Sequence, residues 1–244
     1  MKIRFLGSGD AFGNGGRLNT CMHITGDKTN FLLDCGATSL VALKSNGIRA
    51  NEIGLILISH YHADHGGGIP FFILDAQFSK RTEPLTIAGP PGLAEWYERV
   101  MESGFPGSSK TVQRFELTLK ELQPRSGYDL GGIAVTPFPV MHGAAAGTCF
   151  AYRMEIEGRT IAYTGDTEWT DELIDAGSDS DLLIAEAYFF DKRVKNHLDI
   201  ATLKARLPSI RTKRLLLTHL GRDVLARLNE VEDEYAEDGK IIEL

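Results

Sequence analysis

The chain has few cysteines, no long apolar run and no excess of positive charge. Its three cysteines, Cys21, Cys35 and Cys149, lie far apart and form no CxxC pair. A disulfide framework is therefore disfavoured, and a reducing cytoplasm is the expected compartment. The first residues lack the apolar core of a signal peptide, and no run approaches the roughly 20 residues of a membrane-spanning helix. We expect a cytoplasmic protein without a membrane partner.

The charge balance disfavours nucleic acid as a partner. The formal net charge of the 244 residues is −7, and the sequence pI is about 5.5. An acidic chain gains no general electrostatic attraction to nucleic acid or to anionic membranes. A hydrophobic content of 43% is ordinary for a globular protein and provides for a sizeable core. A small-molecule substrate is therefore expected.

Short strand-like runs alternate with helical spacing in both halves of the chain. No linker, repeat or low-complexity segment interrupts them, so we predict one layered α/β domain over residues 1–244. Apolar runs such as 55–60 are typical of strands buried on both faces. Polar side chains recur just past the ends of these runs, at Asp34, His60, Asp166, Glu186 and His219. Ligand sites of α/β proteins gather at such strand ends.

The segment HYHADH places His60, His62, Asp64 and His65 within six positions, directly after an apolar run. Without a cation, each buried polar atom left unsatisfied would cost about 1–3 kcal/mol. A divalent metal removes that cost, and imidazole with carboxylate suits zinc and related first-row metals. The cluster therefore predicts a metal site.

Geometry indicates that the segment serves two ions. Alternate side chains of an extended segment share a face, so His60, His62 and Asp64 are expected to point together. A turn after them would aim His65 elsewhere, and Gly66–Gly68 are expected to permit it through unusual backbone angles. One motif cannot complete two sites. The further candidates, each following an apolar run, are His142, Asp166 and His219.

The segment HYHADH followed by His142, Asp166 and His219, together with the earlier Asp34, resembles the pattern of the metallo-β-lactamase superfamily. The resemblance implies a four-layer αββα sandwich with a dinuclear centre of two divalent ions. Zinc is favoured, while manganese, iron and nickel stay open. By the family pattern one ion takes His60, His62 and His142, the other takes Asp64, His65 and His219, and Asp166 bridges the two.

The segments FLGSGDA, AGPPG and DLLIAEAYF are most similar to the branch that holds ribonuclease Z and the phosphodiesterase of phosphonate metabolism. The resemblance implies that Glu186 holds His197, which would act on the phosphate, while Asp64 would orient the nucleophile. That branch carries a His-Glu-Ala-Thr signature, and here Ala185 replaces its histidine and Tyr188 its threonine. Before His197, the residues Lys192, Arg193 and Lys195 form either a solvated loop or an added positive charge.

Ribonuclease Z carries a long tRNA-gripping arm that this chain lacks. Only 23 residues separate His142 from Asp166, and they read as one hairpin. We therefore expect a phosphodiesterase that attacks a small phosphodiester with a metal-bridging hydroxide. One alternative is hydrolysis of a carbonyl or sulfate ester: a lactone, lactam, thioester or arylsulfate. Another is tRNA 3′-end cleavage with help from a partner subunit, since enzymes of this branch are often homodimers.

Two further classes fit less well. Iron-dependent redox relatives depend on a flavin partner domain, for which 244 residues leave no room. A non-catalytic scaffold is disfavoured because the ligand set is intact.

Overall fold

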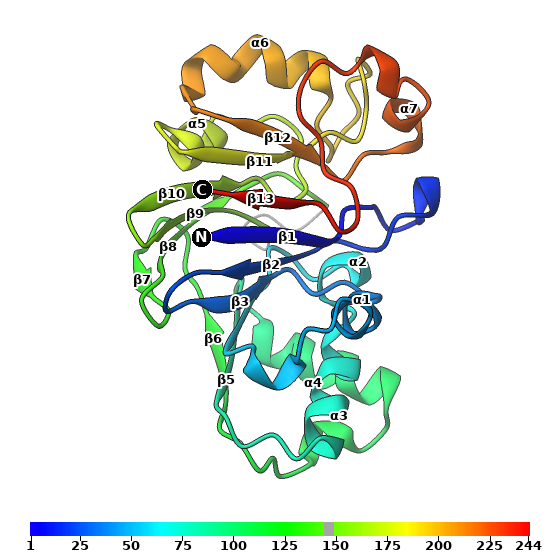
Figure 1. The fold of residues 1–244 in the computed structure, drawn as a ribbon, viewed down its shortest axis with the longest axis vertical. Helices are drawn as coiled ribbons and strands as arrows, with labels where there is room; N and C mark the ends of the chain where they lie inside the picture. The colour runs from blue at the N-terminus through cyan, green and yellow to red at the C-terminus, as the bar shows by residue number, and fades with distance from the viewer. Residues whose placement is uncertain (144–148) are drawn as a thin grey trace.

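The computed structural model describes residues 1–143 and 149–244. In this part of the chain two mixed β-sheets pack face to face, and helices cover the outer side of each (Figure 1). Helices α1 to α4 lie against one sheet and α5 to α7 against the other. The predicted αββα sandwich is confirmed.

The first sheet changes from antiparallel to parallel at β3. Its strands from β13 to β3 pair antiparallel, and those from β3 to β6 pair parallel. Parallel neighbours need crossover connections, which α1, α3 and α4 supply. In spatial order, the seven strands of the described residues are β13 (Ile241–Glu243), β1 (Lys2–Gly7), β2 (Cys21–Thr25), β3 (Asn30–Leu33), β4 (Leu55–Leu57), β5 (Leu85–Gly89) and β6 (Leu117–Glu121).

The second sheet is organised in the same way. Its strands β12, β11 and β10 pair parallel, whereas β10, β9, β8 and β7 pair antiparallel. The hairpin predicted between His142 and Asp166 is formed by β9 and β10, and its turn residues Glu157 and Gly158 both have positive φ. In spatial order, the six strands of the described residues are β12 (Leu215–Thr218), β11 (Leu182–Glu186), β10 (Arg159–Tyr163), β9 (Phe150–Ile156), β8 (Ala134–Pro139) and β7 (Tyr128–Asp129).

The helices are short. None of those in residues 1–143 and 149–244 has both the length and the apolar character needed to cross a bilayer. Helix α1 ends before Gly47 at φ 67°, as the Asn-Gly pair predicts. The α-helices are α1 (Ser39–Ser45), α2 (Ala63–Gly66), α3 (Ile69–Phe78), α4 (Leu93–Gly104), α5 (Glu172–Gly177), α6 (Ile200–Ile210) and α7 (Arg222–Leu225), and 3₁₀ turns occur at Asn14–Gly16, Ala50–Glu52, Ser108–Lys110 and Leu228–Glu230.

Alternation along the strands produces three apolar layers. In β3, Phe31 and Leu33 enter the core between the sheets, whereas Leu32 packs with the residues of α1 and α3. On the outer face of the second sheet, Leu183 packs with Leu203 of α6. Because both faces of the central strands are buried, their sequences read as unbroken apolar runs. The sandwich holds these strands rigidly, and their carboxyl ends carry the polar residues described next.

Candidate metal centre

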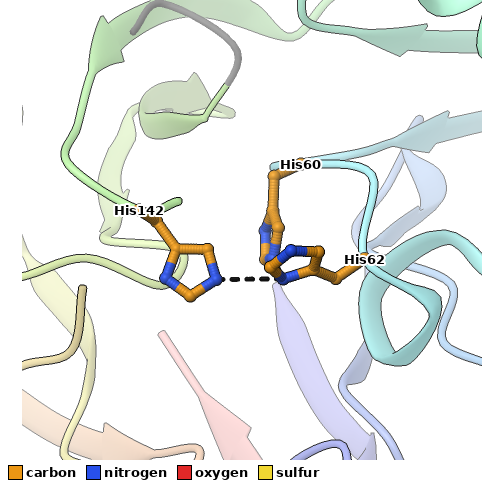
Figure 2. Close-up of side chains that lie close together, drawn as sticks. All are labelled: His60, His62 and His142. Atoms are coloured by element: carbon orange, nitrogen blue, oxygen red, sulfur yellow. Dashed lines mark hydrogen bonds between the residues drawn. The ribbon is translucent and has the colours of Figure 1, made fainter. Parts of the chain in front are cut away.

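Three histidines converge from two distant segments (Figure 2). His60 and His62 follow β4, and His142 follows β8. The Nδ1 atom of His62 lies 3.1 Å from His60 Nε2 and 3.0 Å from His142 Nε2. His60 and His142 are buried, whereas His62 is exposed and leaves this cluster open to solvent on one side.

A second cluster lies beside the first and contains two carboxylates. Its members Asp64, His65, Asp166 and His219 are all buried. Asp166 Oδ1 lies 3.3 Å from His65 Nε2, and Asp166 Oδ2 lies 3.1 Å from His219 Nε2. The same Oδ2 atom lies 3.8 Å from His142 Nε2 of the first cluster. Asp166 therefore stands between the two clusters, as a bridging residue must.

Hydrogen bonds on the outer side orient most of these rings. A residue outside the clusters engages Nδ1, which leaves Nε2 facing the centre. The Nδ1 contacts are His60 with Ser59 Oγ at 3.1 Å, His65 with Asp34 Oδ2 at 2.8 Å, His142 with the Asn196 carbonyl at 2.7 Å and His219 with Thr20 Oγ1 at 3.2 Å. His62 instead presents Nδ1 to the other two rings.

Asp34, which follows β3, supports the second cluster from behind. Its carboxylate accepts hydrogen bonds from Ser59 N and Oγ, from Tyr163 Oη and from His65 Nδ1, all between 2.7 and 2.9 Å. Asp34 is fully buried and has φ 59°, a conformation that is unfavourable for most residues. The bonds hold it there, and they place the carboxylate under His65.

The ring of His142 depends on a chain of contacts through Asn196. Because a carbonyl can only accept, His142 Nδ1 carries the proton, and Nε2 keeps a lone pair for a metal. The backbone N–H of Asn196 donates to Glu168 Oε2 at 2.8 Å. Asn196 also lies in the left-handed region, with φ 72°. Glu168 thus positions the carbonyl that sets the tautomer of His142.

The first cluster holds neutral imidazoles. Burial lowers the pKa of His60 well below its usual value, and the nearby His65 adds to this effect. Burial likewise lowers the pKa of His62 and of His142. Metal ions bind the unprotonated ring, so these three side chains are ready as ligands near neutral pH.

The second cluster concentrates negative charge. Burial alone would lower the pKa of His65, but Asp166 and Asp34 outweigh it and raise that pKa well above its usual value. Burial would also raise the pKa of Asp166, but His219 and His65 hold it well below its usual value. His65 Nε2 and Asp166 Oδ1 are buried and form no hydrogen bond within the described residues. Such donor atoms fit a divalent cation between them.

The two predicted catalytic residues outside the clusters, Glu186 and His197, are also brought together. Glu186 Oε2 lies 2.9 Å from His197 Nδ1, and its other oxygen accepts from the Thr167 backbone N–H. The ring of Tyr188, where the branch signature differs, stacks on His197 with centroids 4.4 Å apart. A nitrogen of His197 lies within 4.8 Å of donor atoms of His142 and Asp166. Burial, reinforced by Asp166, raises the pKa of Glu186 well above its usual value.

Two predictions about the backbone of HYHADHGGG are wrong. Asp64 does not continue an extended segment, because α2 begins at Ala63 and carries both Asp64 and His65. Gly67 and Gly68 have ordinary φ values of −66° and −80°. The glycines provide space instead. A Cβ at Gly66 would lie 2.8 Å from Trp96, and one at Gly68 would lie 2.3 Å from the Gly36 carbonyl.

A hollow of about 450 Å³ lies over the centre, and Phe12 lines it with 79% of its surface exposed.

The sequence did not reveal several residues that support the centre. Ser59 and Asn196 directly precede the predicted site residues His60 and His197, and Glu168 lies two positions after Asp166, so proximity was a weak signal for these three. Thr20 and Tyr163 gave none, because tertiary contacts alone bring them to the site.

Comparison with known proteins gives a match over nearly the whole chain. A family model described as anti-Pycsar protein Apyc1 matches residues 1–238. Ribonuclease Z of Agathobacter rectalis is 31% identical over 160 residues, which are 64% of this chain and 49% of that protein. The match thus spans about half the length of the first curated relatives. Ribonuclease Z of Methanosarcina acetivorans is 25% identical over an alignment of 266 positions, which covers 90% of this chain and 87% of that protein.

Solved structures agree with the sandwich. Human tRNase Z, short form, superposes with a TM-score of 0.80 at 25% identity, covering 100% of this chain and 99% of its own. A diphosphatase of the PhnP family superposes with a TM-score of 0.76 at 20% identity, covering 100% and 97%. At that identity the second likeness concerns the fold alone.

Proposed function

The chain belongs to the anti-Pycsar protein Apyc1 family, within the ribonuclease Z-like branch of the metallo-β-lactamase superfamily, and from that premise we propose that it is a dinuclear metal-dependent phosphodiesterase acting on a small phosphodiester. The membership confirms the resemblance seen in HYHADH and the later single ligands. The observation that carries the proposal is the position of Asp166 between two clusters of donor atoms.

We assign the ligands as the geometry groups them. His60, His62 and His142 would hold one ion, Asp64, His65 and His219 the other, and Asp166 both. Bound there, two divalent ions would acidify a water molecule to a pKa of about 7 and neutralise charge on the phosphate. Neutral nitrogen with carboxylate oxygen favours zinc, and manganese, iron or nickel would suit the same donors.

The chain's own residues then direct the reaction. Asp64 faces His65 and His219 and would orient the nucleophile through its carboxylate. Glu186 and the Tyr188 ring fix His197 so that its second nitrogen faces the centre. From there His197 would stabilise charge on the phosphate or deliver a proton to the leaving oxygen.

The surroundings favour a compact substrate. The hollow over the centre, about 450 Å³, is of the size that takes a small molecule. Between Cys149 and Asp166 the described chain forms only the hairpin of β9 and β10, which offers no tRNA-gripping arm. The family description names an antagonist of Pycsar, and we carry that role over as part of the proposal.

The test is hydrolysis of bis(p-nitrophenyl) phosphate by protein reconstituted with zinc or manganese. His62→Ala should lower kcat/KM by about 100-fold or more, because it removes a ligand from the reacting centre. His23→Ala is the matched control, since His23 contacts Asn30 and is the one histidine of the chain outside the centre. Cyclic nucleotides and RNA ends are the next substrates.

Protein shown to hold about two ions that hydrolyses no phosphodiester would contradict the proposal. A panel of lactone, lactam, thioester and arylsulfate substrates would then test the carbonyl and sulfate ester alternative. The relatives named ribonuclease Z support a second candidate, cleavage of a tRNA 3′ end, which a precursor tRNA tests directly.

A further inference from the structure

An exposed aromatic ring lies at the hollow over the metal centre. Phe12 lines this hollow, although 79% of its surface is open to solvent. Within residues 1–143 and 149–244, no other aromatic ring stacks on it. Its apolar faces are therefore accessible to a molecule that enters the hollow, and covering them would remove apolar surface from water.

Hydrogen bonds of the backbone hold Phe12 in this position. Asp10 is fully buried, and its carboxylate accepts from the backbone N–H groups of Phe12 and Asn14, each at 3.1 Å. Gly13 follows with φ 63°, a conformation that glycine adopts readily. Because these bonds involve only the backbone of Phe12, its side chain takes no part in forming the turn. The local fold therefore does not explain why an aromatic ring is placed there.

Asp10 also connects this turn to other residues of the hollow. The side-chain amide of Asn19 donates to the Asp10 carbonyl at 3.0 Å. Burial, reinforced by the neighbouring Asp10, raises the pKa of the Tyr188 hydroxyl to about 12. The ring of Tyr188 in turn stacks on His197. The backbone of Phe12 is therefore fixed relative to the residue assigned to act on the phosphate.

The rest of the wall is small and uncharged. Besides the metal donors, Tyr188 and His197, the lining consists of apolar or neutral side chains, namely Ala11, Phe12, Asn19, Ala37 and Ala63. None of these five could bind a further ionic group of a substrate through an opposite charge. The methyl groups of the alanines leave room for a flat ring. The hollow of about 450 Å³ is large enough for a phosphate with one attached ring.

We propose that Phe12 is a substrate-binding residue that stacks on an aromatic ring carried by the phosphodiester, and that it selects aromatic over aliphatic substrates. The inference rests on the proposed phosphodiesterase function and narrows its substrate class. Offset stacking requires a planar partner, so an aliphatic group of the same size gains less from Phe12. The phosphate itself is bound by the metal centre in either case.

The experiment compares two slow diesters of equal charge as competitive inhibitors of bis(p-nitrophenyl) phosphate hydrolysis by the metal-loaded enzyme. Methyl phenyl phosphate carries a planar ring, and cyclohexyl methyl phosphate carries a puckered ring of similar size. The phenyl compound should have an inhibition constant about fivefold lower. Phe12→Leu, which keeps an apolar side chain but removes the planar face, should reduce this ratio to about one, and Phe12→Trp should keep it. Phe78→Leu is the matched control, since Phe78 of α3 is 81% exposed and does not line the hollow.

The outcomes separate this inference from the proposed function. Equal inhibition constants in the wild type, or a ratio that Phe12→Leu leaves unchanged, would overturn the role of Phe12 while the phosphodiesterase stands. A Phe12→Leu variant that binds both inhibitors more weakly by the same factor would also overturn it, because Phe12 would then support the centre and not the ring. Absence of turnover in protein that holds two ions would instead count against the proposed function, and the inference would fall with it.

Discussion

Four hydrogen bonds converge on the carboxylate of Asp34, although Asp34 itself is no predicted ligand. A carboxylate can accept them all, because ionised oxygens offer about four lone-pair sites. The bonds tie β3, the loop after β4, and β10 to one point beneath His65. At the scale of single residues, the geometry of the centre therefore depends on supporting residues such as Asp34 as much as on the ligands themselves.

Asp34→Asn should destabilise the fold and weaken the second metal site. An amide supplies one acceptor and turns a donor toward groups that also donate, so we expect a loss of about 2–3 kcal/mol in unfolding free energy. Metal affinity should fall about 10- to 100-fold. Denaturant unfolding and zinc titration measure the two effects. Tyr163→Phe, which removes only the Oη bond to Asp34, should show a smaller loss of each, and equal effects would contradict this account.

Glu168 gives a second prediction at this scale. Glu168→Ala removes the acceptor of the Asn196 N–H, frees the carbonyl that orients His142, and should weaken the first metal site by about tenfold. Glu168→Gln keeps an acceptor oxygen and should restore most of the affinity. Metal titration measures both, and the idea fails if the two variants bind metal equally weakly.

At the scale of elements, one turn residue joins the two sheets. Glu157, in the β9–β10 turn, accepts from the backbone N–H groups of Asp27 and Lys28 in the β2–β3 turn, and from Thr29 Oγ1. A Cβ at Gly26 would lie 2.3 Å from its carboxylate, so a larger residue there would displace the Glu157 side chain. These bonds, led by that of Lys28, lower the pKa of Glu157.

Glu157→Gln should therefore lower the midpoint of thermal unfolding in a pH-dependent way. Because the folded pKa lies below the unfolded value of about 4.3, the stabilisation by Glu157 is present above that pH. It is lost as the pH falls through the folded pKa. Melting curves at pH 7 and pH 3 should show a difference from the wild type that narrows in acid. Glu155→Gln, on the same hairpin, controls for the loss of one negative charge.

Elements were predictable where one periodicity dominated. The buried strands, helix α4 and the turn at Glu157-Gly158 follow from apolar runs and glycine positions. Helix α2 could not be predicted, because its four residues are too few for a periodic pattern and because HYHADH also fits an extended segment. The close packing at Gly66 depends on Trp96 of α4, which no local pattern reveals.

At the scale of the whole molecule, metal binding should stabilise the fold. The donors come from both sheets, so an ion that binds them links the two halves of the sandwich. At a free concentration about 1,000 times Kd, one ion would add about 4 kcal/mol. Chelation should therefore lower the unfolding temperature, and zinc should restore it.

Metal analysis checks the number of ions in the same experiment. We expect about two equivalents in the wild type, and about one in His62→Ala and in His65→Ala, because each variant removes a ligand of a different ion. One equivalent in the wild type would contradict the dinuclear centre. The predicted single domain, cytoplasmic compartment and homodimer remain predictions, and sedimentation of the metal-loaded protein would test the last.

The linear sequence alone predicted a layered α/β domain and the clustered donors, because apolar runs and four donor residues within six positions are local signals. The resemblance of these motifs to a known family implied the sandwich. The tertiary structure decided how those donors face one another. Asp34, Asn196 and His219 adopt positive φ without being glycine, and partners from other segments hold them in place. The hollow over the centre also arises from separate segments. Such contacts join residues far apart in the chain, and their geometry is set only when the sheets pack.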